Sequence, residues 1–208
     1  MEFSHHETIV IFDVETSGLN PNEDKIIELG AVVLRKEGHQ FKKDETINVI
    51  VNIEKPLSET IKNITNISDE MIENGIQLSE LLDIVESLLE EKPLLVAYNL
   101  PFDVSFLRGL YKAFDKDHTI LDQCDVLDML TVYRAKHPYP HKLDNAVKTY
   151  DISVQNTHRA LDDAMATYEL LETMHDQYGL TSYINVLGSL KKYPYKGIKF
   201  PHIQYISQ

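Results

Sequence analysis

Two acidic side chains stand at the end of an otherwise apolar stretch near the start of the sequence. Asp13 and Glu15 follow the run IVIF at residues 9–12, whose β-branched and aromatic residues are typical of a buried strand. Side chains alternate between the faces of a strand, so both carboxylates point to the same side. Neighbouring carboxylates repel each other and are costly to bury, and a hard cation such as Mg²⁺ or Mn²⁺ offsets that repulsion. The segment alone also fits a strand that simply ends in a polar turn.

Two further acids and a histidine lie at element boundaries later in the chain. Asp103 follows a short apolar run and the segment 99–102, and Asp163 lies five residues after His158. Residues five apart do not share a helix face, so we expect His158 on the loop before a helix that contains Asp163. Taken singly, Asp103 would more often be a helix N-cap and His158 a surface residue. In an α/β sheet, strand ends and helix starts gather in one crevice, where these residues can meet the first acidic pair.

Four carboxylates and one histidine are the groups that a two-metal phosphoryl-transfer site requires. The candidate metal ligands are Asp13, Glu15, Asp103 and Asp163. Two divalent cations held between them can stabilise both the attacking water and the departing oxygen of an in-line displacement. A histidine has an ordinary pKa of about 6.5, so His158 can accept the proton of that water at neutral pH. The pattern predicts a phosphodiester substrate and names no substrate beyond that class.

Hydrophobic periodicity predicts the elements that must position these residues. Apolar β-branched runs predict strands at 9–14, 26–34 and 46–51, arranged as an antiparallel meander with a polar connection over 35–44. A short buried strand is predicted at 94–97, and helices at 78–89, 104–114, 125–135, 143–150 and after His158. Strands followed by alternating strands and helices predict an α/β fold, with a mixed central sheet flanked by helices.

Composition sets limits on the class of protein. With 208 residues, 43% of them hydrophobic and 25% charged, the chain can fill one well-packed core. It has one cysteine, Cys124, and neither a signal-peptide pattern nor a long apolar run, so we expect a cytoplasmic protein with no membrane partner. The net charge of −13 disfavours tight, non-specific coating of DNA but allows a metal-dependent nuclease, whose cations meet the phosphates.

Three motifs resemble those of one enzyme family. DVETSGL at 13–19 and NLPFD at 99–103 resemble the first and second motifs of the DEDDh 3′–5′ exonucleases. HRALDD at 158–163 matches their third motif, His-x-Ala-x-x-Asp. The motifs stand in the family's order, and the resemblance covers residues 8–174. Within the family, the chain is similar to the DnaQ-like proofreading exonucleases, which are the epsilon subunit and the exonuclease domain of bacterial replicative DNA polymerases.

The resemblance implies a ribonuclease H-like fold and the release of nucleoside 5′-monophosphates from a 3′ end. It implies that Asp13, Glu15, Asp103 and Asp163 hold two divalent cations, Mg²⁺ or Mn²⁺, with His158 as the general base. The residues implied to bind the substrate are Thr16, Ser17, Gly18, Leu19, Asn99 and Phe102. The implied partners are single-stranded or frayed 3′ ends of DNA and a DNA polymerase that the exonuclease would proofread.

Some features depart from the family pattern. Tyr98 replaces a histidine that many relatives carry, and Pro101 replaces a small residue. Neither removes a metal ligand, so we expect altered substrate fit with the chemistry retained. Residues 1–179 are expected to form the exonuclease domain, and 180–208 a basic aromatic tail that packs on or extends the same domain. The tail interleaves lysines with aromatics, a pattern typical of single-strand binding and also of docking on an acidic body: Lys191, Lys192, Lys196, Lys199, Tyr193, Tyr195, Phe200 and Tyr205.

Three functions fit these observations, and the first is a DNA exonuclease that proofreads. The second is a 3′–5′ exoribonuclease similar to RNase T and oligoribonuclease. The motifs do not separate the two, because the distinction depends on contacts to the 2′-hydroxyl. The third is a catalytically idle module that docks on a polymerase. The intact acid set argues against this third function, since an idle module has no need to keep carboxylates that repel one another.

Overall fold

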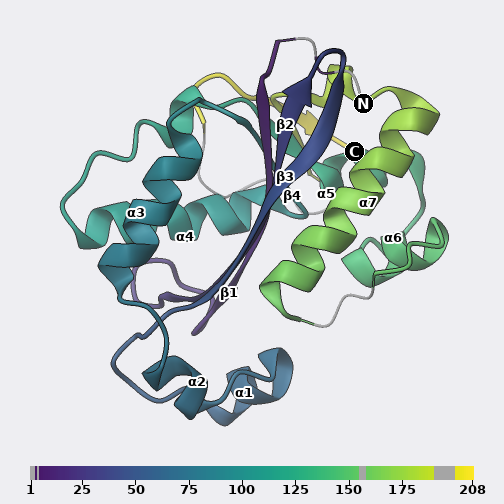
Figure 1. Cartoon of the computed structure of the whole chain (residues 1–208). Helices are drawn as coiled ribbons and strands as arrows, with labels where there is room; N and C mark the ends of the chain where they lie inside the picture. Colours follow the sequence, from purple (N-terminus) through teal and green to yellow (C-terminus); the bar gives the residue numbers. More distant parts are fainter. Residues whose placement is uncertain (1–2, 4, 155–157, 190–199) are drawn as a thin grey trace.

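A five-stranded mixed sheet forms the centre of the computed structural model, with strand order β3-β2-β1-β4-β5 (Figure 1). The structure describes residues 3, 5–154, 158–189 and 200–208. The strands β1 (Thr8–Thr16), β2 (Ile26–Glu37) and β3 (Gln40–Ile50) form an antiparallel meander. The strands β4 (Leu94–Ala97) and β5 (Val126–Asp128) run parallel to β1. The predicted α/β class and mixed sheet are confirmed.

Helices cover both faces of this sheet. They are α1 (Glu59–Thr65), α2 (Asp69–Glu73), α3 (Leu78–Leu89), α4 (Leu100–Ala113), α5 (Met129–Lys136), α6 (Leu143–Thr149) and α7 (Ala160–Tyr178). In Figure 1, α3 and α4 lie on one side of the sheet, α6 and α7 on the other, and α1 and α2 at one end. No helix in the described part of the chain is long and apolar enough to cross a membrane.

The alternation of β1 decides which face carries the acids. Val10, Phe12 and Val14 pack into the core cluster that includes residues of α3 and α4. Ile9 and Ile11 pack into the opposite cluster, which includes the inner side of α7. Asp13 and Glu15 continue the second series, so they point toward α7 at the carboxyl end of the strand.

The region 125–135, predicted as one helix, is a strand followed by a helix. Residues 126–128 form β5, in which Val126 pairs with Leu95 and Asp128 with Ala97, and α5 begins at Met129. A three-residue apolar strand is too short to be distinguished from a helical turn by its periodicity. Residues 126–128 therefore form the fifth strand because they pair with β4, and not because of a local sequence pattern.

The polar segment 35–44, predicted as a connection, is mostly strand. It forms the distal half of the β2–β3 hairpin, which turns at residues 38–39. Charged side chains are paired here, as between Arg35 Nε and Asp44 Oδ2 at 2.8 Å. A hairpin end that projects into solvent tolerates charges. The prediction of a loop, which was based on low hydrophobicity, was therefore wrong.

A second, smaller sheet pairs β6 (Val186–Ser189) with β7 (Gln204–Ser207) in parallel. Between α4 and β5 lies the 3₁₀ turn η1 (Leu121–Gln123), and η2 (Thr181–Tyr183) precedes β6. The tail residues Lys191, Lys192, Lys196, Lys199, Tyr193 and Tyr195 lie outside the described residues. Phe200 is buried beneath the guanidinium of Arg108, 4.7 Å from the ring centroid, and its N–H donates to the Tyr205 hydroxyl.

Candidate active site

A hydrogen bond joins the end of β1 to the start of α4. Asp103 lies in the first turn of α4 and is 2% exposed. Its Oδ1 accepts a hydrogen bond from the backbone N–H of Val14 at 3.1 Å. Val14 separates Asp13 from Glu15, so this bond brings the third predicted ligand to the first pair.

The start of α7 contributes from the other side. Asp163 is buried in the first turn of this helix, and the exposed His158 lies on the preceding loop with φ of +56°. Glu15, His158 and Asp163 each offer a ligand atom, and these atoms all lie within 4.8 Å of one another. The predicted placement of His158 on the loop and of Asp163 in the helix is confirmed.

Burial and repulsion raise the pKa values of Asp13, Glu15 and Asp103. Burial, followed by the charges of Asp103, Asp163 and Glu15, raises the pKa of Asp13 well above its usual value. Burial and the charge of Asp163 raise the pKa of Glu15 to about 8. Burial also raises the pKa of Asp103, although the Val14 N–H acts in the opposite direction. Ionising all of these acids would therefore create more negative charge than their surroundings can compensate, which a divalent cation bound to oxygen ligands would offset.

Glu28 and Arg159 belong to the same cluster. Glu28 lies outside the three motifs, and Arg159 occupies an unspecified position of the third. Glu28 is the β2 partner of Glu15 and is completely buried. The Arg159 guanidinium donates to both its oxygens at 2.7–3.1 Å, and the Ala160 N–H donates at 3.0 Å. These bonds fasten the start of α7 to β2. A lone glutamate inside the apolar run 26–34 was the available signal.

Gly30 permits the close approach of α7. A Cβ at this position would lie 2.2 Å from the carbonyl carbon of Ala160 and from the nitrogen of Leu161. Both atoms are backbone, so neither can rotate away. Gly30 is also the β2 partner of Asp13. The missing side chain thus lets α7, and with it Asp163, sit directly against the strand pair.

The turn after β1 is stabilised by hydrogen bonds within the turn and to Asp24. The Thr16 hydroxyl donates to the Gly18 carbonyl at 2.6 Å, and the Ser17 hydroxyl donates to Asp24 Oδ1 at 3.3 Å. A Cβ on Gly18 would lie 2.4 Å from Asp24 Oδ2, so only glycine fits this packing without a shift. Leu19 leaves the turn with 84% of its surface exposed. The turn therefore presents one apolar side chain on a fixed backbone.

The second motif begins α4. Asn99 precedes the helix with φ of +75° and is exposed. Phe102 is half-buried and lies against Phe106, with ring centroids 5.0 Å apart. Tyr98 is half-buried, packs against the core cluster that includes α7, and donates from its hydroxyl to the His141 carbonyl at 2.8 Å.

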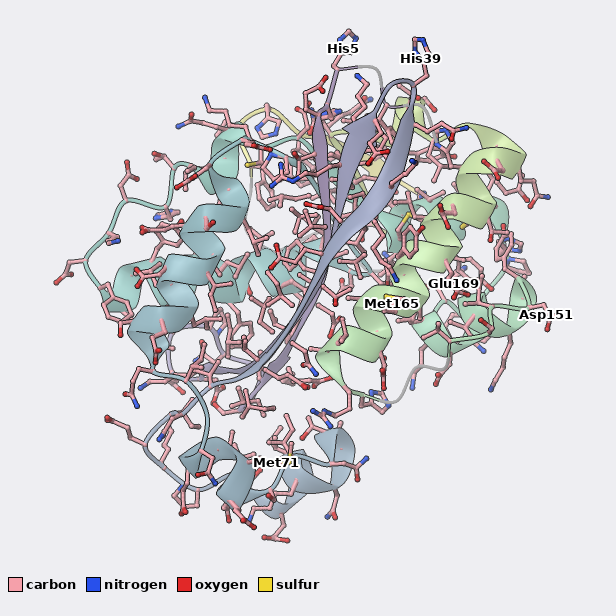
Figure 2. The ribbon with its side chains drawn as sticks, viewed as in Figure 1. His5, His39, Met71, Asp151, Met165 and Glu169 are labelled. Carbon is pink, nitrogen blue, oxygen red and sulfur yellow. The ribbon has the colours of Figure 1, made fainter. Side chains whose placement is uncertain are left out.

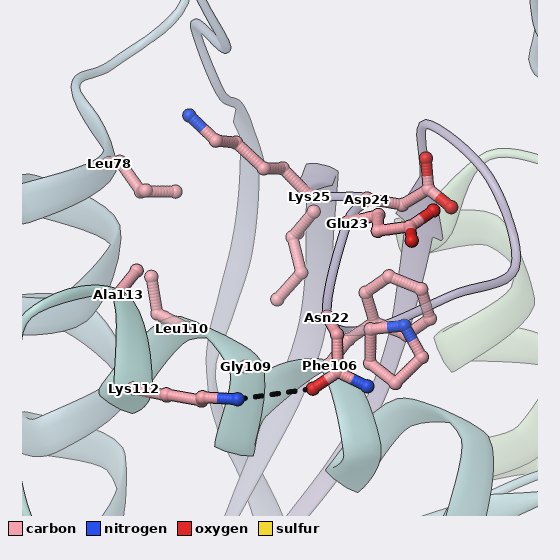
Figure 3. Close-up of a pocket in the computed structure, with 12 residues that line it drawn as sticks. Asn22, Glu23, Asp24, Lys25, Leu78, Phe106, Gly109, Leu110, Lys112 and Ala113 are labelled. Carbon is pink, nitrogen blue, oxygen red and sulfur yellow. Dashed lines mark hydrogen bonds between the residues drawn. The ribbon is translucent and has the colours of Figure 1, made fainter.

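A pocket of about 260 Å³ lies between α4 and residues 21–26, which follow the turn at 16–19 (Figure 3). Leu78, Phe106 and Leu110 give it an apolar wall, and Lys112 Nζ donates to Asn22 Oδ1 at 3.3 Å. None of the predicted site residues lines it. His5 and His39 project at the opposite end of the molecule from α1 and α2 and take no part in the cluster (Figure 2).

Comparisons with known proteins identify relatives of this arrangement. The family model described as exonuclease, RNase T, matches residues 10–171. The PolC-type DNA polymerase III of Bacillus subtilis is 36% identical over 175 residues, which cover 82% of this chain and 12% of that protein. The corresponding polymerase of Latilactobacillus sakei is 37% identical over 164 residues, covering 78% of this chain and 11% of that protein. This chain therefore corresponds to a small part of these relatives.

Solved structures resemble the fold. The crystal structure of E. coli exonuclease I in complex with a dA16 oligonucleotide has a TM-score of 0.74 and 19% identity, covering 85% of this chain and 42% of that one. A product-bound structure of exonuclease I has a TM-score of 0.73 and 19% identity, covering 86% and 46%. The likeness extends over most of the described chain.

Proposed function

The chain belongs to the exonuclease family as a DEDDh-type nuclease, and we propose on this premise that it is a metal-dependent 3′–5′ exonuclease that acts on DNA. One observation carries the proposal: Glu15, His158 and Asp163 converge within 4.8 Å beside Asp13 and Asp103. The five residues come from β1, α4, α7 and the loop before α7. These acids come from separate places in the chain and repel one another. The simplest explanation for their convergence is that they hold cations at a reaction centre.

The carboxylates fit two divalent cations. Asp13, Glu15, Asp103 and Asp163 would hold them. Burial and the neighbouring negative charges raise the pKa values of Asp13, Glu15 and Asp103, and bound cations would favour their ionised forms. Hard oxygen ligands favour Mg²⁺ or Mn²⁺ over softer metals. When bound, the cations would supply charge stabilisation to the phosphate and lower the pKa of a water molecule.

His158 would take the proton of the attacking water. Its loop position brings a ring nitrogen within 4.8 Å of the Glu15 and Asp163 oxygens, where a nucleophile would lie. The residue is exposed, so the proton can pass on to solvent after each cleavage. Glu28 and Arg159 would hold the loop and the start of α7 while this happens.

The turn 16–19 and the start of α4 would hold the 3′ end. Thr16, Ser17 and Gly18 give a fixed backbone, and Leu19 offers an exposed apolar side chain to a base. Phe102 would lie against the terminal nucleotide from the α4 side, and Asn99 would orient the strand. Each nucleotide would leave as a 5′-monophosphate.

DNA is favoured as the substrate because the similar proteins are DNA polymerases, and a fold neighbour is bound to dA16. The same relatives support association with a DNA polymerase and a proofreading role. RNA cleavage would require tolerance of the 2′-hydroxyl at the 3′ end. The test below therefore includes both nucleic acids.

The function is tested with 5′-labelled oligonucleotides of one sequence, as single-stranded DNA, single-stranded RNA, and duplex DNA with a matched or mismatched 3′ end. With Mg²⁺ or Mn²⁺, we expect a ladder shortening from the 3′ end of DNA, fastest for single-stranded and mismatched ends, and no reaction with chelator. Asp13→Ala should reduce the rate by about 1,000-fold, or about 4 kcal/mol of transition-state stabilisation. Asp176→Ala is the matched control, because Asp176 is an exposed aspartate near the other end of α7.

Cleavage that persists in chelator would contradict the metal assignment. Equal rates for Asp13→Ala and Asp176→Ala would place the reaction elsewhere. Faster shortening of RNA than of DNA would replace the DNA substrate with the ribonuclease alternative.

A further inference from the structure

A buried carboxylate outside the three motifs holds the start of the helix that carries Asp103. Asp128 ends β5 and is 3% exposed. Its Oδ1 accepts hydrogen bonds from the backbone N–H groups of Asn99 and Leu100 at 3.0 and 3.1 Å. The first N–H groups of a helix have no partner inside that helix. Asp128 therefore supplies, from a neighbouring strand, the acceptor that the start of α4 needs.

The conformation of Asn99 explains why this acceptor comes from another strand. Its φ of +75° is in the left-handed region, and its own side chain makes no capping hydrogen bond. β4 and β5 are parallel neighbours with Ala97 paired to Asp128, so both strands end beside the same turn. The position of Asn99 thus depends on the Asp128 carboxylate.

The second carboxylate oxygen of Asp128 bonds to a residue outside the acidic cluster. Its Oδ2 accepts from the Thr131 N–H at 3.1 Å and from the Thr131 hydroxyl at 2.6 Å. The same hydroxyl accepts from the Gly188 N–H at 2.8 Å. A hydroxyl has a single proton, so it donates to Asp128 and offers a lone pair to Gly188. Thr131 is completely buried, and water cannot easily replace either bond.

Further contacts fasten the same region. Gln208 Nε2 donates to the Thr131 carbonyl at 2.9 Å, and Arg134 Nη1 donates to the Gly188 carbonyl at 3.2 Å. Gly188 lies in β6, beyond residue 171, where the match to the exonuclease family model ends. A segment outside the matched region is therefore bonded, through Thr131 and Asp128, to the start of α4.

We propose that Asp128 and Thr131 are positioning residues for Asp103, and that strand β6 anchors them. Asp103 lies in the first turn of α4 and accepts the Val14 N–H, so a shift of the helix start moves this ligand relative to β1. The inference rests on the proposed function, because it assigns Asp103 to the metal site. Groups outside the ligand set that orient a metal ligand typically change metal affinity or activity by about 10- to 100-fold when removed.

The test compares Thr131→Val, which keeps the shape and loses the hydroxyl, with Thr131→Ser, which keeps the hydroxyl. In the full chain, Thr131→Val should weaken Mn²⁺ binding, measured by calorimetry without substrate, by roughly 10-fold or more. Its rate on single-stranded DNA at fixed Mn²⁺ should fall in parallel. Exchange of the Asn99 and Leu100 amide hydrogens should accelerate, while Thr131→Ser stays within about twofold of the unaltered protein in all three measurements.

Equal Mn²⁺ binding and equal amide exchange in the valine and serine variants would overturn the inference. If the unaltered protein cleaves no 3′ end, the proposed function fails, and Mn²⁺ binding and amide exchange still decide the role of Thr131. If Thr131→Val does not fold, Thr131→Cys replaces it, because a thiol donates and accepts only weakly. The Mn²⁺ affinity of the cysteine variant should then be lower than that of the serine variant, and equal affinities would overturn the inference.

Discussion

The surroundings of single residues in the cluster oppose their ionisation. Glu15 faces Glu28 across the β1–β2 pair and Asp163 across the gap to α7. Arg159 compensates part of this charge, but its guanidinium bonds to Glu28. The pKa of Glu15 therefore rises to about 8, chiefly through burial and the charge of Asp163. Without a cation, ionisation of this residue opposes folding.

A pH dependence of stability follows from Glu15. A carboxyl whose pKa is raised on folding favours the folded state fully below its unfolded pKa, and this contribution is lost as pH rises through the folded value. For Glu15 the window runs from its usual 4.5 to about 8. In chelator, the free energy of unfolding should fall by up to about 5 kcal/mol across this window, or up to about 10–20 °C in Tm.

The measurement is thermal unfolding of the metal-free protein at several pH values. Glu15→Gln is the control, because it keeps the shape and cannot ionise, so its Tm should vary less with pH. Added Mn²⁺ should restore the high-pH Tm of the unaltered protein and not that of the variant. A Tm that rises with pH in chelator would contradict the raised pKa.

At the scale of elements, α7 is the part that completes the cluster. Its start is bonded to β2 by Glu28, Arg159 and the Ala160 N–H, and it lies against the backbone of Gly30. This contact is between backbones, with no flexible side chain between them to absorb a change. Small changes at Gly30 should therefore move Asp163 and His158 together.

Gly30→Ala should displace the start of α7 and reduce both stability and activity. The added Cβ would lie 2.2 Å from backbone atoms of Ala160 and Leu161, so the helix must shift. We expect a loss of about 1–3 kcal/mol in the free energy of unfolding, as for other overpacked sites, and a larger fractional loss of exonuclease rate. Urea unfolding and the rate on single-stranded DNA measure the two effects.

The matched control is Gly38→Ala in the β2–β3 turn. Gly38 has φ of +65°, and no described atom outside its chain neighbours lies within 4 Å of the place that a Cβ would take, so alanine there strains only the turn. Its stability should fall by about 1 kcal/mol while the rate per folded molecule stays unchanged. A Gly30→Ala rate equal to that of Gly38→Ala would show that α7 tolerates the displacement.

At the scale of the whole molecule, the charge of −13 shapes how a nucleic acid can bind. Most acids lie on the surface as solvated or paired groups, and the formal charge also counts the buried acids of the cluster. Phosphates would therefore be repelled by the apoprotein as a whole. Affinity for a 3′ end should depend on bound cations and on stacking at Leu19 and Phe102 more than on surface lysines.

The salt dependence of binding tests this balance. With Ca²⁺ in place of the catalytic metal to slow cleavage, the logarithm of affinity for a short single strand should fall with the logarithm of salt with a slope of about −1 to −2. Fluorescence anisotropy at several KCl concentrations measures it. Substituting the four tail lysines, Lys191, Lys192, Lys196 and Lys199, by glutamine should leave the slope unchanged. A slope of about −4 to −5 that becomes shallower by about 3 in the glutamine variant would assign binding to the tail.

The sequence alone was sufficient for the class of fold, the meander, the final long helix and the placement of His158 before it. These depend on local patterns: alternation along β1, helical spacing after His158, and motifs whose members are close in the chain. It failed at 125–135, where a three-residue strand has no period of its own, and at 35–44, where a charged hairpin resembles a loop.

Other features were decided only by the tertiary structure. Glu28, Gly30 and Asp128 lie outside the three motifs, and they act on residues distant in the chain: Glu28 on Ala160, Gly30 on Leu161, Asp128 on Asn99. Such relations depend on strand register and on helix packing, which local periodicity does not specify. The sequence therefore determined which groups could do the chemistry, while the packing of α4 and α7 against β1 and β2 decided how closely they meet.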